Sequence, residues 1–145
     1  MAESLKGWYT VVNTHKYVGK KQPYCRSSWE MVFCRKCDMH PNIIQWAHEP
    51  VKIPYKNPLE RGDKYTVYVP DFLIVYIDKF GKRHAEMIEI KPAKESTLEA
   101  AKATRDKARV VVNAAKWEAA SKYCNKLGIR FRVITEDNIF NRPKK

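Results

Sequence analysis

The sequence lacks any long apolar run. No stretch of its 145 residues is long or apolar enough to span or anchor in a bilayer. Met1 to Lys20 contains no apolar core run, so we also expect no secretory signal peptide. Internal repeats and low-complexity tracts are missing as well. A chain of this length with 44% hydrophobic residues suits one domain with a buried core.

Acidic residues are scarce relative to basic ones. The chain has 28 Lys and Arg against 16 Asp and Glu, which gives a formal net charge of +12 and a pI near 9.6. A positive balance of this size favours a polyanionic partner, and double-stranded DNA fits better than a membrane surface because no anchoring segment is present.

Cysteine is too sparse for a disulfide framework or a typical zinc site. Of the four cysteines, Cys34 and Cys37 form a CxxC pair, but no second pair follows. The two fall on one face of a predicted helix, where cysteine packs like a small hydrophobic residue. We therefore interpret the cysteines as reduced thiols in a cytosolic setting and disfavour zinc.

The chain is organised around Val69 to Lys91, where two apolar runs flank a tight turn. Val67 to Ile77 is rich in β-branched and aromatic residues, which predicts a strand. Its core, Phe72 to Tyr76, is unbroken in apolar residues and predicts burial on both faces. Glu86 to Lys91 is the predicted partner strand.

The turn determines the register of this predicted hairpin. Lys79 to Gly81 fits a three-residue loop, with Gly81 in the left-handed conformation that side chains disfavour. Counting outward from this loop places Asp71 opposite Glu89, so both side chains point to the same face about 5 Å apart. Lys91 lies two residues beyond Glu89 and shares that face.

Two close carboxylates raise each other's pKa, and a divalent cation between them removes the conflict. Mg²⁺ accepts carboxylate oxygens and retains several waters, so it can activate water and neutralise a phosphoryl oxygen. The alternative is a surface cross-strand cluster, with Asp71 closing a Pro-Asp turn and Glu89 paired with Lys91.

The remaining elements predict an α/β fold in which helices flank a mixed β-sheet. A first helix is expected over Ser27 to Asp38, and one or two strands broken at Pro50 over Asn42 to Tyr55. Lys94 to Lys126 lacks proline and glycine and is predicted to be largely helical. A strand follows at Ile129 to Ile134, and a final short helix begins at Thr135. The core stripe expected on the long helix comprises Val110, Trp117, Ala120, Cys124 and Leu127.

We divide the chain into a basic N-terminal arm (1–22), a domain (23–140) and a basic tail (141–145). Lysines and aromatic residues alternate in the arm, a composition that can follow a nucleic-acid backbone and stack on bases. An arm that packs over the domain or onto a partner protein is an equally good interpretation.

Pro70-Asp71, followed after seventeen residues by Glu89-Ile90-Lys91, resembles the PD-(D/E)xK nuclease superfamily. The arrangement is similar to the branch that contains TnsA-like endonucleases and the head-completion nucleases of T4-like phages, and the resemblance to the phage proteins is closer. It extends over most of the chain from residue 24 and follows the family's order. Its further segments are Tyr24–Glu30, Trp46, Ile53–Tyr55, Ala115–Trp117, Tyr123–Cys124 and Ile134–Glu136.

The resemblance implies a restriction-endonuclease-like core and a Mg²⁺-dependent DNA endonuclease, with Mn²⁺ able to substitute and a 5′-phosphate left on the product. Asp71, Glu89 and the carbonyl of Ile90 would bind the metal, and Lys91 would activate water and stabilise the transition state. The resemblance also places Glu30 beside the metal. A capping box, Ser27-x-x-Glu30, is a sufficient structural reason for the same glutamate.

The residues expected to contact DNA lie on three segments. By resemblance, Lys116 would hold the scissile phosphate and act in catalysis, with Asn113 beside it; a solvated helix face is the alternative. Arg26 is a candidate phosphate contact or an ordinary surface arginine. Lys20 and Lys21 belong to the basic arm.

The resemblance further implies action on packaged DNA ends during phage head completion, before tail attachment. Portal or neck proteins would be partners, and the protein would occur in the virion head–neck region and, during assembly, in the host cytoplasm. The alternative is a catalytically weak structural head–neck protein that binds DNA through a nuclease fold. A TnsA-like or restriction-type role is disfavoured because no added recognition domain is visible.

Overall fold

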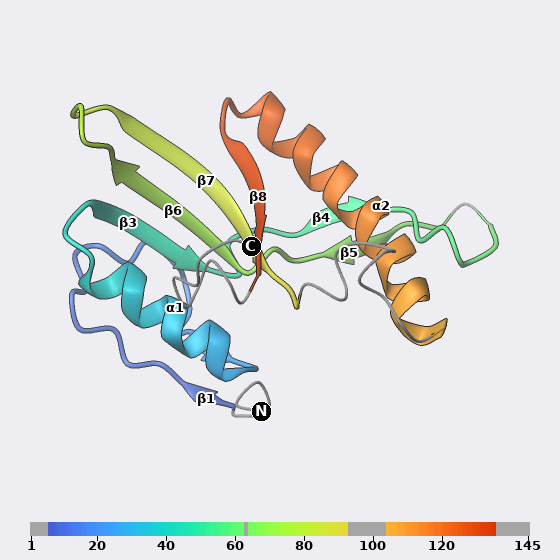
Figure 1. The fold of residues 1–145 in the computed structure, drawn as a ribbon, viewed down its shortest axis with the longest axis horizontal. Helices are drawn as coiled ribbons and strands as arrows, with labels where there is room; N and C mark the ends of the chain where they lie inside the picture. The colour runs from blue at the N-terminus through green and yellow to red at the C-terminus, as the bar shows by residue number, and fades with distance from the viewer. Residues whose placement is uncertain (1–5, 63, 93–103, 136–145) are drawn as a thin grey trace, which may run out of the picture.

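The computed structural model describes residues 6–62, 64–92 and 104–135 (Figure 1). Two helices and eight strands are assigned in these ranges. In chain order they are β1 (Gly7–Trp8), β2 (Tyr24–Cys25), α1 (Ser28–Met39), β3 (Ile43–His48), β4 (Ile53–Tyr55), β5 (Thr66–Tyr68), β6 (Phe72–Ile77), β7 (Arg83–Ile90), α2 (Thr104–Lys126) and β8 (Arg130–Ile134).

A four-stranded sheet forms the centre of the fold, in the order β3-β6-β7-β8. β6 pairs antiparallel with both β3 and β7, and β8 pairs with β7 in parallel. The predicted α/β fold with a mixed sheet is therefore confirmed, including the return of the chain through a long helix to a strand beside β7. Two short ribbons, β1–β2 and β4–β5, accompany the sheet (Figure 1).

The β6–β7 hairpin has the predicted register. The N–H of Asp78 donates to the carbonyl of Lys82 at 2.8 Å, and Gly81 has a φ of 80°. Every residue pair between β6 and β7 has the register that the turn predicts. One further step along both strands places Asp71 opposite Glu89, and this juxtaposition is the basis of the site described below.

The predicted continuous strand from Val67 to Ile77 is wrong, because the chain changes sheets in the middle of it. β5 ends at Tyr68 and pairs with β4, whereas β6 begins at Phe72 and pairs with β3 and β7. Pro70 lies in the interruption and has no N–H with which to continue a ladder. The break places Asp71 at the end of the sheet, directly before β6.

The predicted burial of β6 on both faces is wrong, because only one face of the strand is buried. Phe72 and Ile74 are buried, whereas Leu73 and Val75 between them are half-buried. The buried face packs against α1, where Trp46 of β3 and Ile88 of β7 are also fully enclosed. This cluster is the main core of the described structure.

A second core joins α2 to the β4–β5 ribbon. Ile53, Tyr55, Tyr68 and Ala120 are its buried members. The predicted stripe on α2 is largely correct, but Leu127 is 58% exposed because it lies in the turn after the helix ends at Lys126. The second core therefore holds Tyr68 at the edge of the central sheet.

The expected N-terminal arm, from residue 6 onward, packs against the domain. Tyr9 is buried, and its hydroxyl donates to Asp38 Oδ2 at 2.6 Å. The ammonium of Lys16 donates to the carbonyls of Asp38 and His40, both at 2.9 Å. These bonds fasten residues 9–16 to the end of α1, and β1 pairs with β2 beyond them.

Several expectations fall outside the described residues: the helical character of 94–103, the helix expected to continue from Thr135, and the tail at 141–145. Neither α1 nor the described part of α2 combines the length and apolarity that a bilayer crossing needs.

Candidate active site

The carboxylate of Asp71 lies against the end of β7, beside Glu89. Asp71 Oδ2 accepts a hydrogen bond from the N–H of Ile90 at 2.8 Å. Glu89 is only 4% exposed, although Asp71 remains partly accessible. The backbone therefore orients one carboxylate beside the other at the open end of the hairpin.

Both carboxyl groups have a raised pKa. For Asp71 the causes are desolvation by the surrounding protein, followed by the negative charges of Glu89 and Glu30. For Glu89 the cause is desolvation by burial, which the charge of Lys91 opposes. Two carboxylates whose anionic forms are both disfavoured constitute a site that a cation would stabilise.

Glu89 is held from two directions. The hydroxyl of Tyr68 donates to Glu89 Oε1 at 2.7 Å, and Lys91 Nζ lies 3.7 Å from Glu89 Oε2. The Lys91 side chain is 27% exposed, so its ammonium can also reach solvent or a ligand. Its position on the face of Glu89 is the one predicted from strand alternation.

Tyr68 is a site residue that sequence reasoning missed. Burial and the neighbouring Glu89 raise the pKa of its hydroxyl, so it acts as a hydrogen-bond donor. It reaches the site only because β5 belongs to a separate ribbon and the chain turns at Pro70. The sequence carried no signal for this contact, since Tyr68 was assigned to the same strand as Asp71.

The predicted residues of the long helix reach the site. Lys116 Nζ lies 5.8 Å from the ring centroid of Tyr68 and 5.9 Å from that of Tyr55, and its charge acts on the pKa of Glu89. Asn113 is 4% exposed. A pocket of about 420 Å³ is lined by Lys91, Asn113 and Lys116, together with Arg109 from the same helix. These groups give the pocket a cationic wall.

Glu30 lies at the start of α1, within electrostatic range of Asp71. Its N–H donates to Ser27 Oγ at 3.2 Å, which confirms the N-cap. Its carboxylate accepts from the N–H of Arg26 at 3.2 Å instead of from the predicted N–H of Ser27. Glu30 Oε1 also lies 3.1 Å from Nε2 of His48, a buried residue at the end of β3. Direct metal binding by Glu30 remains a prediction.

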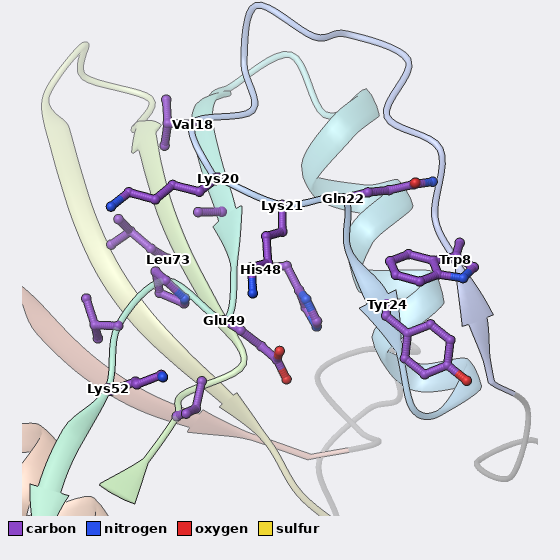
Figure 2. A pocket seen from close by; sticks show the side chains of 15 residues that line it. Trp8, Val18, Lys20, Lys21, Gln22, Tyr24, His48, Glu49, Lys52 and Leu73 are labelled. Atoms are coloured by element: carbon purple, nitrogen blue, oxygen red, sulfur yellow. The ribbon is translucent and has the colours of Figure 1, made fainter.

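The other predicted DNA contacts are divided between two places. The guanidinium of Arg26 pairs with the carboxylate of Glu49, and it also lies within electrostatic range of Asp71. Glu49 has a left-handed φ of 49°, and its N–H donates to the carbonyl of Asp71 at 2.8 Å. Lys20 and Lys21 line a different pocket, beside Glu49 (Figure 2).

The donor set fits a hard divalent cation. Two carboxylates, with the carbonyl of Ile90 predicted as a third donor, would leave coordination positions for water, as Mg²⁺ prefers. Within the part of the chain that the structure describes, no three His, Cys, Asp or Glu side chains are grouped to hold a metal ion. Cys25, Cys34 and Cys37 are buried free thiols, and Cys25 Sγ lies 3.4 Å from Cys34 Sγ.

Comparison with known proteins places the site in a family. The family described as TnsA-like endonuclease N terminal matches residues 40–136, which include Asp71, Glu89, Lys91 and Lys116. The chain is also 36% identical to the head completion nuclease of Enterobacteria phage T4, over 94% of each protein. The chain therefore belongs to the family of TnsA-like endonucleases.

Proposed function

We propose that the protein is a Mg²⁺-dependent DNA endonuclease that cuts packaged DNA ends during phage head completion. The observation that carries this proposal is the pair of desolvated carboxylates, Asp71 and Glu89, at the open end of one hairpin with Lys91 beside them. The phage role is supported by similarity to the T4 head completion nuclease over 94% of the chain.

The side chains divide the work of phosphodiester hydrolysis. Asp71, Glu89 and the carbonyl of Ile90 would hold Mg²⁺, with Glu30 completing the acidic surroundings. When bound, Mg²⁺ supplies charge neutralisation at a phosphoryl oxygen and lowers the pKa of water. The hydroxyl of Tyr68 holds Glu89 in place, as the supporting groups of metal sites do.

Lys91 and Lys116 act on the phosphate side of the pocket. Because an ammonium only donates hydrogen bonds, Lys91 orients the attacking water and stabilises negative charge on the phosphoryl oxygens. Lys116 neutralises the scissile phosphate from α2, with Asn113 beside it. Lys91 lines this pocket and also pairs with Glu89, so it joins the cationic wall to the acidic pair.

The direct test is cleavage of linear and supercoiled DNA with Mg²⁺ and with EDTA, using wild type and Glu89→Gln. We expect metal-dependent cutting that leaves 5′-phosphates and is lost in Glu89→Gln. Glu118→Gln is the matched control, because Glu118 is an exposed glutamate of α2 paired with Lys122. Titration calorimetry with Mg²⁺ should show binding that Glu89→Gln weakens and Glu118→Gln does not.

Binding of DNA without cutting by the folded wild type, under both Mg²⁺ and Mn²⁺, would contradict the enzyme proposal. It would favour instead a structural head–neck protein with a nuclease fold. In the proposed role the protein works in the head–neck region of the virion, next to portal or neck proteins, after assembly in the host cytoplasm. Co-purification of the Glu89→Gln protein with assembling heads tests this location independently of catalysis.

A further inference from the structure

A second and larger pocket lies beside the candidate active site, and we call it the N-terminal pocket. It has a volume of about 1060 Å³ and shares no lining residue with the pocket of about 420 Å³ that Lys91, Asn113 and Lys116 line. Figure 2 shows its lining coming from the N-terminal segment on one side and from the β3–β4 connection and Leu73 on the other. Ligand sites of about 300–1,000 Å³ enclose a drug-sized molecule, so this pocket has room for more than one nucleobase.

The pocket has an apolar lining and an aromatic end. Val18, Val51 and Leu73 form part of its wall. Trp8 and Tyr24 lie at the opposite end (Figure 2), in edge contact with ring centroids 5.0 Å apart. Trp8 is 62% exposed, which is unusual for a large aromatic side chain in a chain that buries Trp46 completely. An exposed aromatic ring in an apolar hollow is a surface on which a flat ligand can stack.

Lysines surround this apolar surface. Lys20, Lys21 and Lys52 line the pocket and are exposed. Glu49 is the one acid among the described lining residues, and its charge is paired with Arg26. The pocket is therefore suited to a polyanion that also presents apolar rings.

The N-terminal pocket is joined to the candidate active site through the backbone. Glu49, which lines the pocket, donates its N–H to the carbonyl of Asp71 at 2.8 Å. His48, the neighbouring lining residue, bonds to Glu30 at 3.1 Å. A strand held in the pocket would thus lie next to the acidic pair.

We propose that the N-terminal pocket binds an unpaired strand of the DNA substrate, with bases on Trp8 and the apolar wall and phosphates toward the lysines. In a duplex the faces of the bases are stacked against one another, so only an unpaired strand offers them to an aromatic ring. The inference rests on the proposed function and specifies its substrate as DNA in which a duplex adjoins a single-stranded segment.

The test is fluorescence anisotropy in EDTA, where no cutting occurs, with a blunt duplex and the same duplex carrying a single-stranded oligothymidine overhang on either strand. We expect wild type to prefer one overhang DNA by about tenfold, as one or two base stacks would give. Trp8→Ala should bring the ratio of the two affinities to about one, and Trp8→Phe should retain most of it. Phe80→Ala is the matched control, because Phe80 is an 82% exposed aromatic at the hairpin tip.

Tryptophan fluorescence provides a second readout. Trp29 and Trp46 are buried and Trp117 is half-buried, so stacking of oligothymidine should mainly quench the emission of Trp8, and this quenching should disappear in Trp8→Ala. Circular dichroism and thermal melting establish that each variant is folded.

Equal affinity of wild type for blunt and overhang DNA, or an overhang preference that survives in folded Trp8→Ala, would overturn the inference. The latter result would place the bound overhang outside the N-terminal pocket. Neither outcome affects the proposed function, because metal-dependent cleavage of linear and supercoiled DNA is measured separately. Conversely, an overhang preference in a protein that never cuts would support the strand-binding pocket and contradict the proposed nuclease function.

Discussion

Two aspartates bracket strand β6, and their carboxylates have opposite electrostatic surroundings. Asp71 precedes the strand and Asp78 follows it, and each accepts backbone N–H donors. The pKa of Asp78 is lowered by its hydrogen bond to His84 and by the N–H of Lys82. The pKa of Asp71 is raised because protein desolvates it and other carboxylates lie close.

The surroundings of an aspartate, and not its residue type, decide whether it forms part of a candidate metal site or only closes a turn. Asp78 is stable as an anion with the donors that its own hairpin supplies, so it closes the turn and needs nothing else. Asp71 shares its space with Glu89 and Glu30, and the hydrogen bond from the N–H of Ile90 does not offset the desolvation. An anion in that position needs a cation, and this need is the physical basis of the proposed metal site.

The largest difference in cleavage rate is expected between Asp71→Asn and Asp78→Asn, the amide variants of the two aspartates. Asp71→Asn should lower the cleavage rate by at least about 10²-fold, the cost of removing one electrostatic partner of a transition state. Asp78→Asn should retain cleavage while lowering the melting temperature, because the turn loses charged hydrogen bonds. Initial rates on supercoiled DNA and thermal melting measure both. Equal cleavage by folded Asp71→Asn and wild type would remove Asp71 from the site.

Lysines give the next contrast along the same hairpin. Lys91→Ala should lower the maximal rate by about 10²-fold, since Lys91 is proposed to contact the scissile phosphate and the attacking water. Lys79→Ala, at the exposed hairpin tip, should cut at the wild-type rate. Single-turnover kinetics with saturating enzyme separates this loss from weaker DNA binding. A Lys91→Ala protein that binds poorly but cuts at full rate would make the lysine a binding residue only.

Two tyrosines offer a closely matched pair. Tyr68 donates to Glu89 and Tyr76 donates to Glu86, both at 2.7 Å. Each Tyr→Phe variant should lose about 1–2 kcal/mol of unfolding free energy through a missing hydrogen bond to a charged group. Only Tyr68→Phe should also weaken Mg²⁺ affinity or activity, by about tenfold, because the hydroxyl of Tyr68 supports Glu89, a proposed metal ligand. Urea unfolding and Mg²⁺ titrations measure the two effects, and a similar Mg²⁺ loss in Tyr76→Phe would contradict this division.

The smallest expected effect is the change in folding stability of the metal-free protein as the pH changes. A carboxyl group with a raised folded-state pKa favours folding at low pH, and this contribution is lost as pH rises from the unfolded value, about 4, through the folded one. Asp78, whose pKa is lowered, contributes in the opposite sense, and only below about pH 4.

Metal-free wild type should therefore lose stability as the pH rises above about 4, by a few degrees in melting temperature. The loss should be smaller in Asp71→Asn and unchanged in Asp78→Asn. Adding Mg²⁺ should restore more stability at about pH 8 than at pH 5, since binding requires the ionised carboxylates. Thermal melts with EDTA and with Mg²⁺ across this range make the measurement. A melting temperature independent of pH would show that the two carboxyl groups are not desolvated.

The register of the β6–β7 hairpin could be predicted because it depends on local rules. A three-residue loop with glycine in the left-handed position allows one count along two strands, and that count brings Asp71 to Glu89. The break at Pro70 could not be placed, since a proline in a strand pattern indicates either an edge or an interruption. Leu127 was assigned to the core by helical spacing, but the helix ends one residue earlier.

The sequence by itself determined the mixed α/β fold, the hairpin register and the acidic pair, because turn geometry and strand alternation act over short distances. Only the tertiary structure decided that Tyr68 supports Glu89, that Glu30 is joined to His48, and that Trp8 faces a pocket lined with lysines. These contacts join segments whose side chains meet only after separate ribbons and helices have packed, and no local rule specifies them. The charge of the chain predicted a polyanion as partner, whereas the shape of the N-terminal pocket suggests which form of DNA it binds.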